Sequence, residues 1–228
     1  MFNDLELTGR TRTHVVQIDQ PRFAAHPKAA EAFLRMRDAA AEEGFEISPF
    51  STFRDYATQL RIWNNKFDGS KPLYDMDGQV RDRSELGEDG IIRCILNWSA
   101  LPGASRHHWG TEIDVVDAAA MPEGYKVRLL PEETAEGGLF APLHRWLDDN
   151  LYRFGFFRPY AEYRGGMYPE PWHLSYSPIS VPALADMSID LLAQITRESD
   201  MLGKKLVLQM LPEIFEKNVL NIVPPARR

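Results

Sequence analysis

Cysteine is almost absent, since Cys94 is the only one among 228 residues. A single thiol forms no internal disulfide, which excludes both a disulfide-stapled scaffold and a cysteine-rich zinc site. Its apolar neighbours in the sequence are Ile91, Ile92, Ile95 and Leu96. We therefore expect Cys94 to be a small packing residue, because a catalytic thiol needs an exposed and electropositive setting.

Positive charge and long apolar runs are also scarce. The chain has 26 Lys and Arg against 33 Asp and Glu, a net charge of −7. An acidic surface repels phosphate backbones, so no nucleic-acid partner is expected. No apolar run approaches the roughly 20 residues of a membrane-spanning helix, so no membrane span is expected. The sequence predicts nothing about the oligomeric state.

The first seven residues, Met-Phe-Asn-Asp-Leu-Glu-Leu, lack the positive start and apolar stretch of a signal peptide. As written, the sequence predicts a cytoplasmic protein, or a periplasmic or cell-wall protein if a leader has been removed. Hydrophobic residues make up 44% and charged residues 26% of the chain, which is typical of a globular protein. The length is sufficient for residues 1–228 to form one domain.

The first half of the chain alternates predicted strands and helices. Residues 14–19 predict a strand, and Pro27 opens a helix that ends at Gly44. A second strand is predicted over 45–52, where Pro49 indicates an edge or a bulge. Asp55 is expected to cap a helix whose apolar face carries Tyr56, Leu60 and Trp63. The polar stretch 66–90 predicts a loop, in which Asp75–Gly78 forms a tight turn.

The second half predicts short strands among helices. A helix is expected over 90–98, a strand over 112–116, a helix over 143–151 and a strand over 155–157. Further apolar helices follow, one containing Leu184, Leu191 and Ile195, and another containing Leu206 and Met210 that must kink or restart at Pro212. The predicted class is α+β, with a small, mostly antiparallel sheet flanked by helices.

Two motifs carry residues suited to a metal site. The first runs from Ser105 to Asp114, Ser-Arg-His-His-Trp-Gly-Thr-Glu-Ile-Asp. Gly110 permits a tight turn after His107, and strand alternation places Glu112 and Asp114 on one face. Imidazole nitrogen and carboxylate oxygen are suitable zinc ligands, and a catalytic zinc site uses three protein ligands.

The second motif is Glu170-Pro-Trp-His173, which can supply the third ligand. If His173 binds the metal, Glu170 can lie beside the open coordination position and accept a proton from water. Upstream, Ser51-Thr-Phe-Arg54 and Gln59 lie at a strand-to-helix junction. The guanidinium fork of Arg54 is suited to a substrate carboxylate or to a developing oxyanion. An ordinary ion pair with Asp55 or Glu85 is the alternative.

Together these elements resemble the VanY-type D-alanyl-D-alanine carboxypeptidases, in the wider group with lysostaphin-like peptidases and the hedgehog signalling domain. That family shows Ser-x-His-x-x-Gly-x-Ala-x-Asp, then Glu-x-Trp-His or Glu-Pro-Trp-His, with an upstream Ser-x-x-Arg and a following glutamine. The resemblance covers about residues 27–180, and a helical extension occupies about 181–228. It implies the family's fold and one Zn²⁺ per chain.

Carried over residue by residue, the resemblance implies zinc ligands His107, Asp114 and His173, with Glu170 as general base. It also implies a catalytic or binding role for Arg54 and substrate contacts for Ser105 and Gln59. The family's usual alanine is Glu112 here, which adds charge near the metal or shapes the pocket. His14, His26 and His144 have no partner motif, and His108 is expected behind the site or at the surface. Trp109 and Trp172 are expected in the pocket walls.

The leading hypothesis is a zinc peptidase acting on peptidoglycan-type peptides with D-amino acids, most simply a D-alanyl-D-alanine carboxypeptidase. Two alternatives stay open, one a different enzyme and the other a protein without catalytic activity. One is an L,D-carboxypeptidase or endopeptidase that cuts muropeptides during cell-wall recycling. The other is a zinc-containing binding module without activity, against which the joint presence of Glu170 and the three ligands argues.

Overall fold

The computed structural model describes residues 2–226, so Met1 and residues 227–228 of the predicted C-terminal extension lie outside it. Two antiparallel sheets are present. The strands of the first are β1 (Val16–Asp19) and β2 (Arg22–Ala25), and those of the second, in spatial order, are β3 (Ile47–Ser51), β4 (Glu112–Asp117), β6 (His173–Tyr176) and β5 (Phe156–Phe157).

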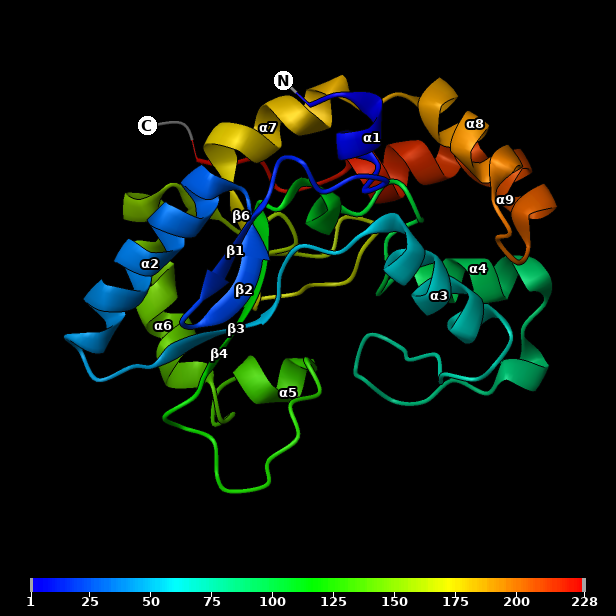
Figure 1. Ribbon diagram of the computed structural model, residues 1–228. Helices are drawn as coiled ribbons and strands as arrows, with labels where there is room; N and C mark the ends of the chain where they lie inside the picture. The colour runs from blue at the N-terminus through cyan, green and yellow to red at the C-terminus, as the bar shows by residue number, and fades with distance from the viewer. Residues whose placement is uncertain (1, 227–228) are drawn as a thin grey trace.

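Helices surround the four-stranded sheet (Figure 1). The α-helices are α1 (Asp4–Leu7), α2 (Pro27–Ala41), α3 (Tyr56–Phe67), α4 (Glu88–Leu96), α5 (Pro131–Thr134), α6 (Ala141–Asn150), α7 (Ser177–Asp186), α8 (Ile189–Glu198) and α9 (Lys204–Ile214). Short 3-10 segments are η1 (Arg83–Glu85), η2 (Arg106–Trp109) and η3 (Leu151–Phe154), and η4 (Phe215–Leu220) is a π-helix. The predicted α+β class, with a small antiparallel sheet flanked by helices, is confirmed.

One hydrophobic core lies between the sheet and the helices α2 and α6 (Figure 1). Ile113, Val115 and Leu174 point from β4 and β6 into this core and are fully buried. Because side chains alternate along a strand, the intervening residues face the other way. Asp114 and His173 are among them, so the same strands that build the core also present polar side chains on the opposite face.

A second hydrophobic core joins α3 and α4 to the C-terminal helices. It contains Trp63 from α3, Ile92 from α4, Leu192 from α8 and Val207 from α9, each essentially inaccessible to solvent. The C-terminal helices α8 and α9 therefore pack against α3 and α4. In Figure 1, α8 and α9 lie above α3 and α4 at the same end of the molecule.

Most of the strand and helix predictions in the first half are confirmed. The helix from Pro27 is α2, which ends at Ala41 before a turn closed by Gly44 at φ +88°. Pro49 lies in β3, an outer strand, and the register shifts between Pro49 and Ser51, so the proline marks both an edge and a bulge. Asp55 caps α3 by accepting a hydrogen bond from Thr58 N.

Three predictions along the chain are wrong or incomplete. Leu184 and Leu191 do not share a helix, because α7 ends at Asp186 and the Ser188 hydroxyl caps α8. The helix α9 continues through Pro212 to Ile214 and changes to π-helical bonding only at Phe215. The strands β2 and β6 were not predicted from the sequence at all.

Within residues 2–226, no single helix is long and apolar enough to cross a membrane. Only α7 and α8 taken together reach that length and composition, and they are bent by 77° relative to each other.

Candidate metal centre and active site

The pairing of β4 with β6 brings Asp114 and His173 together. These two residues are direct partners in the antiparallel register, as are Glu112 and Ser175. All four side chains therefore project from the face of the sheet opposite the α2 and α6 core. The pair Asp114–His173 and the pair Glu112–Ser175 are therefore neighbours on this face, two residues apart along each strand.

His107 reaches the same place from the short segment η2. This turn ends at Gly110, whose φ of +67° is left-handed. A Cβ at Gly110 would lie 2.5 Å from Val15 Cγ1 and 2.8 Å from His26 N, so only glycine fits. The chain then enters β4 at Glu112, and the predicted tight turn between His107 and Asp114 is confirmed.

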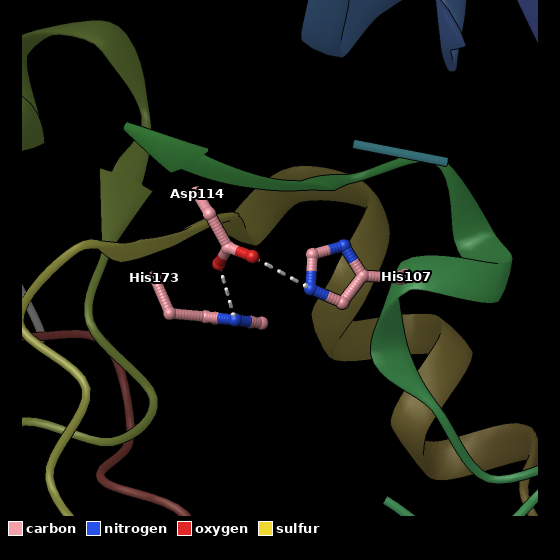
Figure 2. A group of neighbouring side chains, drawn as sticks. All are labelled: His107, Asp114 and His173. Atoms are coloured by element: carbon pink, nitrogen blue, oxygen red, sulfur yellow. Dashed lines mark ion pairs between the residues drawn. The ribbon is translucent and has the colours of Figure 1, made fainter. Parts of the chain in front are cut away.

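Asp114 lies between the two histidines (Figure 2). Its Oδ2 is 3.4 Å from Nε2 of His107, and its Oδ1 is 3.1 Å from Nδ1 of His173. All three side chains are buried, and one ligand atom from each lies within 4.8 Å of the other two. Among the described residues, Oδ1 of Asp114 is buried with no hydrogen-bond partner.

This donor set fits a zinc ion. Two ligand atoms at about 2.1 Å from a tetrahedral zinc ion lie roughly 3.4 Å apart, close to the two separations around Asp114. Two imidazole nitrogens and one carboxylate oxygen are ligands that zinc accepts. The protein group nearest to the unbonded Oδ1 of Asp114 is Nδ1 of His173, so a metal ion held by both atoms would satisfy this buried carboxylate oxygen.

Hydrogen bonds fix which nitrogen of each histidine faces the site. Nδ1 of His107 lies 2.7 Å from the carbonyl oxygen of Thr52, which can only accept, so Nδ1 carries the proton and Nε2 is free. Nε2 of His173 lies 2.8 Å from Oε2 of Glu112, which leaves Nδ1 directed at Asp114. A buried oxygen acceptor behind each ring is the usual arrangement of metal-binding histidines.

Glu112 belongs to a buried polar cluster behind His173, outside the residues that line the cavity. Its Oε1 accepts a hydrogen bond from Ser175 Oγ at 2.8 Å and lies 3.3 Å from Nη2 of Arg106. Burial would raise the pKa of Glu112, but Arg106 and the hydrogen bond from His173 outweigh it and lower the pKa to about 2. The departure from the family's alanine thus adds a carboxylate that orients His173.

Glu170 lies on the other side of His173. Its Oε2 is 3.6 Å from Nδ1 of His173, the nitrogen that faces Asp114. The backbone joins them in a tight turn, in which His173 N donates to Glu170 O at 3.0 Å. Burial raises the pKa of Glu170 to about 7, against the opposing effects of His173 and Arg54. A carboxylate with such a pKa, next to a candidate metal ligand, can exchange protons near neutral pH.

Arg54 faces the same carboxylates. Its guanidinium donates to Gln59 Oε1 at 2.8 Å and to Ser51 Oγ at 3.0 Å. Burial lowers the pKa of Arg54, while Asp114 and Glu170 oppose the shift. The alternative ion pair is not found: in the part of the chain that the structure describes, no carboxylate oxygen lies within 4.0 Å of the guanidinium nitrogens.

Of the two residues predicted to contact the substrate, Ser105 and Gln59, only Ser105 lines the cavity. Ser105 lines the cavity, and its hydroxyl has no hydrogen-bond partner within residues 2–226. Gln59 does not line it: the residue is fully buried, and its amide bridges Arg54 to the carbonyl of Ala100. Gln59 therefore supports Arg54 from behind, because α3 points its side chain into the protein interior.

A cavity of about 260 Å³ contains the candidate site. Beyond the predicted residues, its walls include Lys66, Trp98, Ser99, Tyr160 and Trp172. Sequence reasoning missed Lys66, although a signal existed. Lys66 follows Trp63 by three residues, and Gln59 precedes Trp63 by four, so a lysine lies on the buried face of α3.

The other histidines are structural. His108 is fully buried and donates from Nδ1 to the Arg54 carbonyl at 2.6 Å, so it lies behind the site as expected. His14 bonds to the His108 carbonyl, and His26 caps α2. His144 is buried in α6. Trp172 lines the cavity as predicted, but Trp109 does not, because it is buried in the second core.

Comparison with known proteins identifies the family. Residues 22–179 match the family model described as VanY, D-alanyl-D-alanine carboxypeptidase, and the chain belongs to this family. A protein of Haemophilus influenzae is 34% identical over 137 residues, which is 59% of this chain and 100% of that protein.

Solved structures share the fold. VanYB in complex with D-alanine-D-alanine superimposes with a TM-score of 0.53 at 21% identity, over 86% of this chain and 90% of that one. A mutant of the vancomycin resistance D,D-pentapeptidase VanY in complex with Zn(II) has a TM-score of 0.50 at 23% identity, over 74% of this chain and 82% of that one. At these identities the likeness is one of fold.

Proposed function

We propose that the protein is a zinc-dependent carboxypeptidase that removes the C-terminal residue from peptidoglycan-type peptides ending in D-alanyl-D-alanine. One observation carries this proposal: the buried side chains of His107, Asp114 and His173 converge at one cavity, with Oε2 of Glu170 3.6 Å from Nδ1 of His173. The family description and the dipeptide bound to VanYB support the substrate class.

The three candidate ligands would hold a single zinc ion, with Nε2 of His107, a carboxylate oxygen of Asp114 and Nδ1 of His173 as donors. A zinc ion bound there would supply Lewis-acid chemistry, which lowers the pKa of water and polarises a carbonyl group. Glu170 accepts the proton of the attacking water and passes it to the leaving amine. Its raised pKa suits both steps, because the same carboxyl group must take up a proton and release it near neutral pH.

Arg54 stabilises the negative charge that develops on the scissile carbonyl oxygen. Its guanidinium is held by Gln59 and Ser51, so its donors are oriented before substrate arrives. Ser105 offers a free hydroxyl on the cavity wall for the peptide backbone. Trp172 and Tyr160 are buried aromatic residues in the cavity wall, where they exclude water.

The test uses purified protein loaded with zinc and two defined peptides, a pentapeptide stem ending in D-alanyl-D-alanine and the corresponding tetrapeptide ending in a single D-alanine. Mass spectrometry of the products locates the bond that is cut. We expect loss of one D-alanine from the pentapeptide, no reaction in the presence of a chelator, and recovery on addition of zinc.

Other outcomes distinguish the alternatives. Cleavage of the tetrapeptide alone would identify an L,D-carboxypeptidase, and cleavage within the stem would identify an endopeptidase. Tight zinc binding without hydrolysis of either peptide would contradict the proposal in favour of a binding module.

A further inference from the structure

The cavity contains two cationic side chains, Arg54 and Lys66. Both are partly buried, and their hydrogen-bond acceptors are neutral. Arg54 donates to Gln59 and Ser51, and Nζ of Lys66 donates to Ser99 Oγ at 2.6 Å. Across residues 2–226, neither cation has a carboxylate oxygen within 4.0 Å. Partly buried cations without a counter-ion are costly, so their location in the cavity indicates that a ligand supplies the negative charge.

Lys66 is turned inward from the last turn of α3. A cation at that position commonly interacts with the last carbonyls of its helix. Here the guanidinium of Arg83 donates to the carbonyls of Lys66 and Phe67 instead. The ammonium of Lys66 is directed at Ser99, which follows α4 and is itself buried. An ammonium has three donors, and the bond to Ser99 uses one, which leaves two for a ligand.

The two cations have different neighbours in the cavity. Arg54 interacts electrostatically with both Asp114 and Glu170. Lys66 interacts with Glu170 and Arg54, and burial is the largest cause that lowers its pKa, to about 8. Arg54 is also tied to a candidate metal ligand by the backbone, because its N–H donates to the His107 carbonyl at 3.2 Å, whereas Lys66 is held at Ser99.

A carboxypeptidase binds two negative charges: the oxyanion at the scissile carbonyl and the terminal carboxylate of the residue that leaves. We propose that Lys66, held by Ser99, binds the C-terminal carboxylate of the substrate, while Arg54 stabilises the oxyanion. This inference rests on the proposed function and deepens it, because it restricts the substrate to peptides with a free carboxylate directly after the scissile bond. An endopeptidase has no use for a cation at this position.

The experiment compares a short peptide ending in D-alanyl-D-alanine with its C-terminal amide. Zinc-loaded wild-type protein is expected to prefer the acid. Lys66→Met is expected to lower kcat/KM for the acid by about 30-fold or more, mainly through KM, and to leave the amide rate unchanged. Lys66→Arg retains the charge and is expected to restore part of the preference. Lys71→Met, at an exposed lysine outside the cavity, is the matched control.

Two kinetic results would overturn the inference. If Lys66→Met retains the wild-type preference for the acid, the carboxylate is bound elsewhere. If it slows acid and amide equally, Lys66 acts on Glu170 and not on the substrate. Ser99→Ala provides a second variant without loss of charge, and it is expected to weaken acid binding alone. Thermal denaturation shows whether each variant is folded.

A binding measurement separates this inference from the proposed function. Calorimetry with D-alanyl-D-alanine and its amide on zinc-loaded Glu170→Gln protein needs no turnover. If wild type hydrolyses neither peptide but binding of the acid depends on Lys66, the proposed activity fails and the carboxylate subsite stands. If binding of the acid is the same with and without the lysine, the subsite is wrong whatever the activity.

Discussion

Nε2 of His173 lies 2.8 Å from Oε2 of Glu112, inside a cluster from which solvent is excluded. Because this bond occupies Nε2, Nδ1 is the ring nitrogen that faces Asp114 and Glu170. Arg106 supports the carboxylate from behind and stacks over Trp109 at 4.8 Å. Ring orientation and tautomer of a candidate metal ligand therefore depend on a residue that itself lies outside the cavity.

Glu112→Ala is expected to weaken zinc binding by about 10- to 100-fold, the usual effect of removing the partner of a metal-binding histidine. Glu112→Gln keeps an acceptor for His173, so we expect a smaller loss of zinc affinity than in Glu112→Ala. Chelator competition measures the affinity, and ¹⁵N NMR of the zinc-loaded protein reports the His173 tautomer. Ser175→Ala, which leaves the Glu112–His173 bond in place, is the control. Wild-type affinity in Glu112→Ala would contradict the orienting role.

His173→Ala is expected to abolish stoichiometric zinc, because two remaining ligands do not hold the ion at a catalytic site. Metal analysis after exhaustive dialysis measures the zinc content. His144→Gln, at a buried histidine that does not line the cavity, is expected to keep one zinc per chain. A full equivalent of zinc in His173→Ala protein would remove His173 from the ligand set.

Glu170→Gln is expected to keep its zinc and to lower turnover by about two or more orders of magnitude. The amide has the shape of the carboxylate but cannot accept the proton of the attacking water. Glu162→Gln, at an exposed glutamate outside the cavity, should behave as wild type. Near-normal turnover in Glu170→Gln would refute the assignment of the base.

Arg54→Ala is expected to cost roughly 3 kcal/mol or more in transition-state stabilisation, since a charged hydrogen bond is removed in a buried site. If Arg54 stabilises the oxyanion, the loss appears mainly in kcat, for the free acid and the C-terminal amide alike. Arg54→Lys should recover little, because Gln59 and Ser51 orient a fork that an ammonium lacks. Full activity of Arg54→Ala on both peptides would make the residue structural.

The buried His144 is expected to make the folded protein less stable in acid. Burial, and then the nearby Arg158, lower its pKa from 6.5 to about 3. The unfolded chain therefore binds the proton more readily, and stability falls as the pH drops below about 6.5, with no further loss below about 3. The expected contribution is about 2 kcal/mol at pH 5. Urea unfolding at pH 7.5 and pH 5 should show a smaller pH effect in His144→Gln, and an unchanged pH effect would contradict this.

Local residue patterns were sufficient to predict much of the site. The ligand types, the glycine that turns the chain between His107 and Asp114, and the glutamate three residues before His173 are all short-range features. The helices α2 and α3 were predictable for the same reason, since Pro27 and Asp55 act on the backbone within a few residues. Such signals survive in a linear sequence because the interacting groups are near neighbours along the chain.

The tertiary structure alone decided how distant parts of the chain meet. The register that sets Asp114 opposite His173 joins strands far apart in sequence, and one of them, β6, was not recognised beforehand. Long-range packing also decided three side-chain contacts. Glu112 bonds to His173, Lys66 points inward to Ser99, and Gln59 lies behind Arg54 and holds its guanidinium. Residue type shows what a side chain can bind, but long-range packing and strand pairing determine what lies within its reach.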